Sequence, residues 1–241
     1  MSTRWASMRR APFDAALQTL WLAHQPIVEA KTGALFGYEV LMRSENATIA
    51  GPADLLSSAI ETGQLRRLGR HVRDLAARSP VLESDGPLLF VNLHASDLAD
   101  HHLLAPDQPL TRVAKRVVLE ITERTSLGDV QDVESIACSL RELGFRIAVD
   151  DLGAGYSGLN TLALLEPEFV KIDMSLVRAI DTKPAKQRIV AGLVSLAHDL
   201  GTKVVSEGVE TEAEQRTLVE LGTDLLQGYL IGAPGHLHPA R

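Results

Sequence analysis

The stretch "QPIVEAKTGALFGYEVLMR", residues 25–43, decides the fold. It holds parts of two apolar runs, 24–30 and 37–43, that a short Lys-Thr-Gly turn joins with no room for a helix. Parallel strands need a crossover of about a dozen residues, whereas antiparallel strands can be joined by a tight turn. These two runs are therefore predicted to form an antiparallel hairpin.

Six further apolar runs follow the hairpin, and each holds a polar residue at or near its end: 87–93, 116–122, 146–152, 168–174, 203–209 and 225–231. Helix-like segments lie between the runs, at 52–78, 129–143, 183–200 and 211–221. Apolar strands that alternate with helices are typical of a parallel sheet covered on both faces. The pattern predicts an α/β fold, a modified (β/α)8 TIM-like barrel with one antiparallel strand. We expect residues 1–23 to form an N-terminal lead-in and residues 24–241 to form one domain.

The composition narrows the class of protein. The chain has 241 residues, of which 45% are hydrophobic and 23% charged, an ordinary mix for a packed globular fold. Its net charge of −7 argues against a polymeric nucleic acid as partner. A single cysteine, Cys138, excludes a disulfide framework and a cysteine-based zinc site. No stretch approaches the roughly 18 apolar residues of a membrane helix, so we expect a cytoplasmic protein without a membrane segment.

Polar side chains at or near the ends of the expected strands point to a metal site. They are Glu39, Asn92, Glu120, Asp150, Asp151, Lys171, Glu207 and Gln227. In a (β/α)8 barrel the ends of different strands converge on one mouth, where active sites lie. Carboxylates gathered there would repel one another unless a divalent cation lay among them. Oxygen ligands favour magnesium, manganese or calcium over zinc.

Two adjacent carboxylates, Asp150 and Asp151, end one of the apolar runs. Neighbouring residues of a regular strand point to opposite faces, so both can serve one site only where the strand breaks. Gly153 and Gly155 are expected to supply that break. Other readings stay open: the two acids could be solvated in a loop or cap a helix, and Asn92 could serve only to satisfy backbone groups.

The alternation of side chains along a strand assigns two further groups. Glu39 and Arg43 share one strand face, which would bring a guanidinium, suited to bidentate phosphate contacts, beside the metal ligand. Arg43 could instead pair with an acidic neighbour at the surface. Lys171 and Asp173 also share a face, and a lysine among carboxylates would stay charged and could orient a water. The alternative for Lys171 is a purely structural ion pair.

At this point the sequence resembles the EAL family of cyclic di-GMP phosphodiesterases. The matching pieces, in order, are "QPIV" (25–28), "EVLMR" (39–43), "VNLH" (91–94), "EITE" (120–123), "DDLGAGYSGL" (150–159), "FVKID" (169–173), "SEGVET" (206–211) and "QGYLIGAP" (227–234). The resemblance covers nearly the whole chain and implies a modified barrel with one antiparallel strand, in agreement with the hairpin.

The resemblance also implies an activity and a set of site residues. The expected reaction is hydrolysis of cyclic di-GMP to linear 5′-pGpG with two Mg²⁺ or Mn²⁺ ions, in bacterial second-messenger signalling. By similarity the metal ligands are Glu39, Asn92, Glu120, Asp150, Asp151 and Glu207. The implied catalytic residues are Lys171, Glu207, Glu210, Gln227 and Glu123, and those implied to contact substrate are Gln25, Leu41, Arg43, Asp173 and Pro234. The family often forms homodimers.

The sequence departs from the family pattern at several positions. Val40 stands where the signature has alanine, and Leu152 replaces a common phenylalanine. His94 stands where serine is usual, and we expect it to be structural. The segment after Arg43 is shorter than usual and lacks a tryptophan, which affects the substrate side more than the chemistry.

Two other functions remain as alternatives. A cyclic di-GMP receptor of the same family would bind without cleaving, but such members usually lose several metal ligands, which are present here. An unrelated barrel enzyme, such as an enolase-like proton abstractor, also uses acids at strand ends and a lysine. That class normally carries an N-terminal capping domain, for which the lead-in of residues 1–23 is too short.

Overall fold

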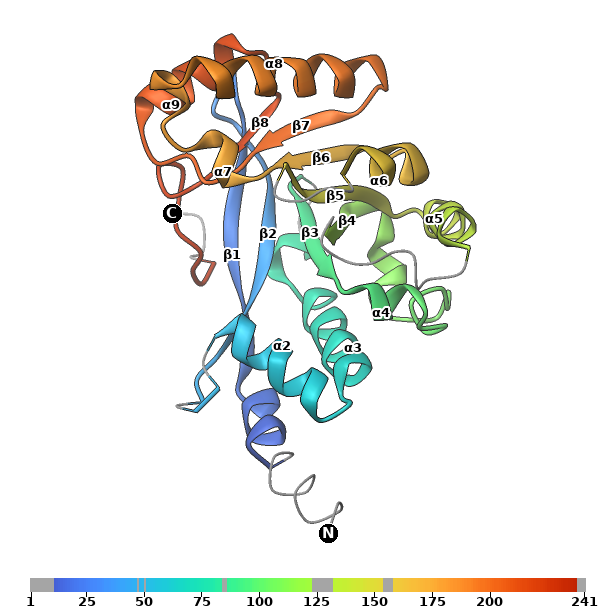
Figure 1. Ribbon diagram of the computed structural model, residues 1–241. Helices are drawn as coiled ribbons and strands as arrows, with labels where there is room; N and C mark the ends of the chain where they lie inside the picture. Colours follow the sequence, from blue (N-terminus) through green and yellow to red (C-terminus); the bar gives the residue numbers. More distant parts are fainter. Residues whose placement is uncertain are drawn as a thin grey trace.

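The computed structural model describes residues 11–46, 48–49, 51–83, 86–122, 132–153 and 158–237. Its strands close into a barrel in which they follow one another in chain order, as predicted (Figure 1). They are β1 (Leu20–Glu29), β2 (Leu35–Ser44), β3 (Leu88–Leu93), β4 (Val117–Thr122), β5 (Arg146–Leu152), β6 (Phe169–Ile172), β7 (Lys203–Ser206) and β8 (Leu225–Gln227).

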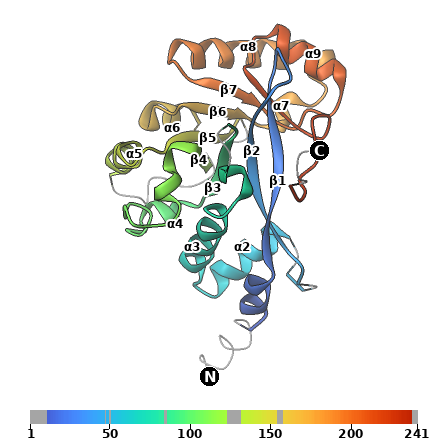
Figure 2. The ribbon, with the colours of Figure 1, turned by 180° about the vertical axis from the view of Figure 1, so that it is seen from behind.

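One strand of the barrel, β1, runs against its neighbours. It pairs antiparallel with both β2 and β8, and the other neighbouring strands pair in parallel. Figure 2 shows β1 and β2 side by side as a long ribbon in the barrel wall. Gly33 in their turn has a φ of 70°, a left-handed conformation that suits glycine. The predicted hairpin is confirmed, although β1 begins at Leu20 and not at residue 24.

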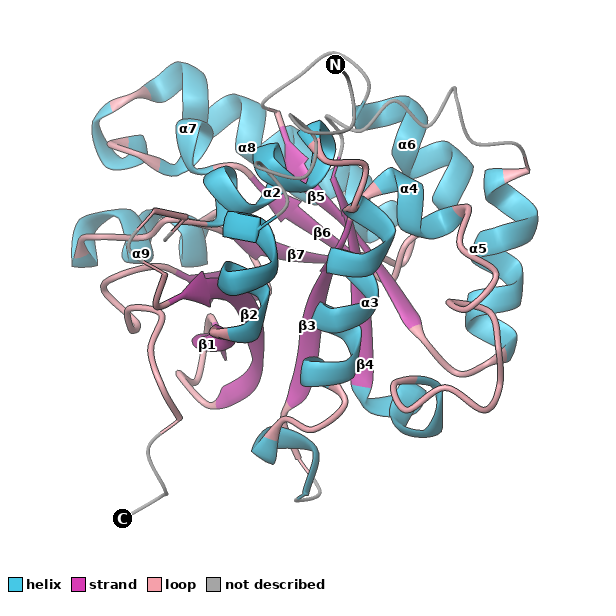
Figure 3. Ribbon diagram, turned by 90° about the horizontal axis from the view of Figure 1, so that it is seen from below, coloured by secondary structure: helices cyan, strands magenta, loops and turns pink. Residues whose placement is uncertain are grey.

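Helices surround the strands, as Figure 3 shows from below. They are α2 (Pro52–Glu61), α3 (Leu65–Ala76), α4 (Ala95–Leu98), α5 (Val133–Glu142), α6 (Gly158–Leu165), α7 (Met174–Val177), α8 (Pro184–Asp199) and α9 (Glu212–Glu220), with short 3-10 turns at Pro80–Glu83, Thr111–Arg116 and Ile180–Thr182. The single helix expected over 52–78 is two helices, because Gly63 adopts a φ of 65° between them. Within the described ranges, no helix has the length and apolar character to span a bilayer.

The chain before β1 is part of the packed structure. Residues 11–18 are helical, and Phe13, Ala16 and Leu17 lie in one buried cluster with Leu55 of α2 and Leu68 of α3. This cluster holds α2 and α3 against the end of the hairpin. The two helices are thereby fixed beside the C-terminal end of β2.

The inside of the barrel explains how the polar groups are placed. A buried apolar layer fills it, formed by Ile27, Leu88, Phe90, Val118, Ala148, Phe169, Val205 and Leu225. Side chains alternate along a strand, so Glu120, two residues after Val118, also points inward, one layer closer to the mouth. The same step leads from Phe90 to Asn92 and from Phe169 to Lys171. The apolar layer is therefore the floor on which the site is built.

Candidate active site

The side chain of Lys171, only 1% exposed, lies at the centre of the mouth. Its Nζ is 2.7 Å from carboxylate oxygens of both Glu120 and Glu207, 3.1 Å from Glu39 and 3.4 Å from Asp150. Burial opposes the charge of this lysine, but the four carboxylates outweigh burial and raise the pKa of Lys171 well above its ordinary value. Side chains from β2, β4 and β5 and from the end of β7 thus converge on one ammonium group.

Glu39 accepts hydrogen bonds on both of its oxygens. Asn92 Nδ2 donates to Oε1 at 2.7 Å, and Gln227 Nε2 and Lys171 Nζ donate to Oε2 at 2.7 and 3.1 Å. Burial alone would raise the pKa of Glu39, but Lys171 and the two amides outweigh it, so this pKa lies below its ordinary value. Glu39 is therefore held as a carboxylate.

Glu120 is fully buried and poorly satisfied. Its Oε1 forms an ion pair with Lys171 Nζ at 2.7 Å, and within the described residues no other polar group satisfies its two oxygens. Burial, followed by the charge of Glu39, raises the pKa of Glu120 well above its ordinary value. A buried carboxylate with a single ion-pair partner is incompletely satisfied, and a cation bound between Glu120 and its neighbours would satisfy it further.

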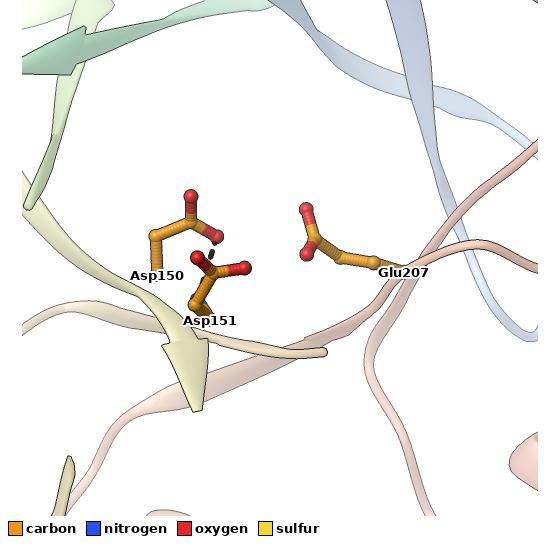
Figure 4. Close-up of side chains that lie close together, drawn as sticks. All are labelled: Asp150, Asp151 and Glu207. Carbon is orange, nitrogen blue, oxygen red and sulfur yellow. Dashed lines mark hydrogen bonds between the residues drawn. The ribbon is translucent and has the colours of Figure 1, made fainter. Parts of the chain in front are cut away.

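Asp150 and Asp151 face one site because the regular geometry of β5 is interrupted at Asp151. The pairing of β5 with β6 shifts register between Val149 and Leu152, and Asp151 has a φ of 61°. The expected break at Gly153, whose φ is 99°, thus begins two residues earlier at Asp151, while Gly155 is outside the described residues. Figure 4 shows the carboxylates of Asp150 and Asp151 pointing toward Glu207.

The group of Asp150, Asp151 and Glu207 has the spacing of a metal site. One carboxylate oxygen from each lies within 4.8 Å of the others. Burial raises the pKa of Glu207 to about 8, with Asp150 and Glu39 adding to the rise and Lys171 opposing it. We call Glu39, Glu120, Asp150, Asp151 and Glu207 the carboxylate cluster. Four of its five acids contact the ammonium of Lys171, and their oxygen donor set fits hard divalent cations.

Two glutamines connect the cluster to the end of the chain. Gln227 Nε2 donates to Glu39 and also, at 3.2 Å, to Oε1 of Gln25. Gln25 in turn donates from Nε2 to the carbonyl of Gly232 at 3.2 Å. Gln25 was expected to contact nucleotide, and here both ends of its buried amide bind protein groups.

A cleft of about 420 Å³ opens beside the cluster. Its polar end is formed by Glu39, Asn92, Asp150 and Thr122. Most of the remaining lining is apolar and comes from β2, α2 and α3: Val40, Leu41, Met42, Pro52, Ala53, Leu56, Leu65, Leu68, Gly69 and Val72. The cleft could therefore hold a molecule with a polar group at the cluster and a less polar body against the helices.

The comparison with known proteins agrees with this geometry. The sequence model described as "EAL domain" matches residues 7–234. The chain belongs to the EAL domain family. Its confirmed fold, with one antiparallel strand, is the one that the sequence resemblance implied.

Relatives of this EAL domain include named phosphodiesterases. It is 35% identical over 225 residues to the bifunctional diguanylate cyclase/cyclic di-GMP phosphodiesterase MucR of Pseudomonas aeruginosa, covering 89% of this chain and 33% of MucR. It is 30% identical over 245 residues to the probable cyclic di-GMP phosphodiesterase PdeN of Escherichia coli, covering 97% of this chain and 47% of PdeN. The chain thus spans a third to a half of the length of these relatives.

Solved structures of similar domains contain the dinucleotide. The c-di-GMP complex of the P. aeruginosa MucR phosphodiesterase has a TM-score of 0.82 and 31% identity, covering 95% of this chain and 97% of the other. The manganese and c-di-GMP complex of Klebsiella pneumoniae BlrP1 has a TM-score of 0.78 and 32% identity, covering 88% of this chain and 55% of the other.

Three other residues that were predicted to bind substrate or act in catalysis contact protein groups in this EAL domain. The guanidinium of Arg43 donates to the carbonyl of Met42 at 2.7 Å, although it was expected beside Glu39. Asp173 caps α7 by accepting from the backbone N–H of Ser175 at 2.9 Å. Glu210 forms an ion pair with Arg178, which holds the loop after β7 against the end of α7. Their parts in binding or catalysis stay predictions.

Leu41 and Pro234 were predicted to contact substrate, and Glu123 to act in catalysis. Leu41 lines the cleft, as a substrate contact would. Pro234 precedes Gly235, whose backbone pairs with that of His24 on β1. Glu123 lies outside the described residues.

The sequence analysis missed the apolar wall of the cleft. Pro52, Ala53 and Leu56 on α2 repeat at helical spacing, as do Leu65, Leu68 and Val72 on α3. This spacing signals one face of each helix. It could have predicted two helices that face a common partner, but not that the partner is a cleft.

Proposed function

We propose that this EAL domain hydrolyses cyclic di-GMP to linear 5′-pGpG with two Mg²⁺ or Mn²⁺ ions. The observation that carries the proposal is the convergence of Glu39, Glu120, Asp150 and Glu207 on Lys171 Nζ, each within 3.4 Å. The names of the relatives and the ligands of the similar structures support the choice of dinucleotide.

The residues of the mouth fit two cation sites that share one aspartate. Glu39, Asn92, Glu120 and Asp150 would hold one ion, and Asp150, Asp151 and Glu207 the other. Asn92 donates an amide N–H to Glu39, and its side-chain carbonyl oxygen remains available to a cation. When bound, such ions supply the charge that makes water a nucleophile at neutral pH and stabilises the phosphodiester during attack.

The lysine would act through its charge. As an ammonium among four carboxylate side chains, Lys171 would orient a water or a phosphate oxygen as a hydrogen-bond donor. Its contacts with Glu120 and Glu207 fix Nζ in the mouth. Gln227 would support this arrangement by holding Glu39.

The cleft would hold the part of the dinucleotide beyond the reacting phosphate. Its carboxylate end suits metal-bridged phosphate, and its apolar wall suits a flat base. A cytoplasmic location and a homodimer complete the proposal, and both stay predictions.

Chromatography of the product tests the proposed function. Protein with Mg²⁺ or Mn²⁺ is expected to convert cyclic di-GMP to pGpG, and Glu39→Ala is expected to lose about 100-fold or more in rate, since changes even around metal ligands typically cost 10–100-fold. Glu45→Ala is the matched control, because Glu45 is exposed just beyond β2. An unchanged rate in Glu39→Ala would refute the role of Glu39. Tight binding without any product would instead identify a receptor.

A further inference from the structure

We propose that His94 positions the substrate, with its Nε2–H donating a hydrogen bond to a phosphodiester oxygen of the dinucleotide in the cleft. This inference rests on the proposed function. It gives a role to a side chain that the sequence analysis expected to be structural.

His94 lines the cleft together with residues of its polar and apolar parts. The residue follows β3 directly, and its φ of −83° and ψ of 152° continue the extended backbone. It therefore shares a face with Asn92, two residues earlier, whose amide binds Glu39. His94, Asn92 and Leu41 all line the cleft.

The hydrogen bonds of the imidazole determine which nitrogen carries the proton. Nδ1 of His94 is 3.1 Å from the backbone nitrogen of Ser96 and 3.0 Å from its hydroxyl. A backbone N–H can only donate, so Nδ1 is the acceptor, and the neutral ring carries its hydrogen on Nε2. Within the described residues, the hydrogen bonds of this ring all go to Nδ1, which leaves the Nε2–H for a ligand.

A buried network fixes the backbone of His94. Its N–H donates to Asp97 at 3.0 Å, and Asp97 is held by Arg73 of α3 at 2.6 Å. Arg73 also binds Asp100 at 2.8 Å. Gly69 packs so closely on Asp97 that a β-carbon there would collide with the carboxylate. The backbone of His94 is therefore anchored to α3, and its ring to Ser96, before any ligand arrives, so the donor is preorganised.

The charged side chains that line the cleft are acidic, so a hydrogen-bond donor among them matters for an anionic ligand. An anionic phosphodiester needs donors, but Glu39, Asp97 and Asp150 in the described lining are acceptors when ionised. Asn92 already donates to Glu39. The Nε2–H of His94 thus offers a neutral donor in the same lining as the expected metal ligands Glu39, Asn92 and Asp150.

Two variants separate the donor from the helix cap. In His94→Ser the hydroxyl can still cap α4, but the Nε2–H is lost, whereas His94→Ala removes both. KM and kcat are measured with Mn²⁺, the Kd for cyclic di-GMP by calorimetry with Ca²⁺ in place of Mn²⁺, and the melting temperature of each variant in parallel. His94→Ser is expected to melt like the wild type while KM and Kd rise about 5- to 30-fold and kcat changes less, as loss of one good hydrogen bond predicts. His94→Ala is expected to show the same KM and a lower melting temperature.

The wild type and an independent readout complete the test. Nitrogen NMR of the imidazole is expected to show the hydrogen on Nε2 of His94 in the free protein. A hydrogen on Nδ1, or a His94→Ser variant with wild-type KM and Kd, would overturn this inference while the proposed function stands. A wild type that neither binds nor cleaves cyclic di-GMP would refute the proposed function, and this inference with it.

Discussion

The ammonium nitrogen of Lys171 lies 2.7 Å from Oε1 of Glu120, and neither side chain is more than 1% exposed. Nζ also contacts Glu39, Asp150 and Glu207. The lysine thus supplies positive charge to acids from separate strands. Loss of this charge leaves buried carboxylates that only protons or metal ions can compensate.

Lys171→Met is therefore expected to destabilise the metal-free protein. Leaving a buried charge uncompensated typically costs about 3–5 kcal/mol. Bound Mn²⁺ would supply the missing charge, so the loss is expected to shrink when Mn²⁺ is present. Chemical denaturation in EDTA and in Mn²⁺ measures both free energies of unfolding, with Lys31→Met on the exposed hairpin turn as control. An equal loss in both conditions would contradict a cation site at the cluster.

Metal binding is expected to depend on pH through Glu207. Its pKa is raised from 4.5 to about 8, chiefly by burial, so the folded metal-free protein holds a proton that the unfolded chain has released. Its contribution to stability is present below pH 4.5 and is lost as pH rises through about 8. A bound cation favours the carboxylate, so binding at pH 7 releases a proton.

Calorimetry of Mn²⁺ binding at pH 7, in buffers with different heats of ionisation, counts these protons. We expect release of about one proton or more, since the pKa of Glu120 is also raised. Glu207→Gln is expected to release fewer. Binding heats that do not depend on the buffer would show that no acid of the cluster gains charge when metal binds.

Because Asp151 has a left-handed backbone, two substitutions can test its charge and its conformation separately. Asparagine tolerates this φ of 61°, whereas a β-branched residue is strained there by roughly 1–2 kcal/mol. Asp151→Asn is expected to keep the melting temperature but to weaken Mn²⁺ binding about 10-fold or more. Asp151→Val is expected to lose stability as well. Wild-type Mn²⁺ affinity in Asp151→Asn would remove this residue from the ligand set.

The barrel interior next to Glu39 is expected to tolerate no added side-chain volume at Gly37. A β-carbon at Gly37 would lie 2.7 Å from the carbonyl oxygen of Leu88, so Gly37→Ala is expected to lose about 1–3 kcal/mol by overpacking. Because Glu39 is two residues further along β2, kcat is expected to fall too. Gly192→Ala on α8 is the control, since a β-carbon there meets nothing within 4 Å and is expected to stabilise the helix. Equal melting temperatures for the two variants would contradict the packing argument.

The sequence predicted the features that follow from local rules. The short turn around Gly33 predicted the antiparallel pairing of β1, and the convergence of strand ends on one mouth predicted that Glu39, Glu120 and Lys171 lie together. Both predictions need only the geometry of strands and the closure of the barrel. The fold and much of the carboxylate cluster could therefore be predicted from the sequence.

Features that depend on contacts between distant segments could not be predicted. Gly153 is left-handed as its lack of a β-carbon allows, but the sequence does not show that Asp151 is left-handed too. The partner of Glu210 is Arg178, from a different helix. The cleft depends on how α2 and α3 pack against β2, and that packing involves residues 11–18. Tertiary contacts set all three.

Crystals grown with Mn²⁺ and cyclic di-GMP, measured at the manganese absorption edge, test the central claim most directly. The account predicts two anomalous peaks in the mouth, one between Glu39, Glu120 and Asp150 and the other between Asp150, Asp151 and Glu207. A mouth without manganese, with Lys171 alone between the carboxylates, would contradict it.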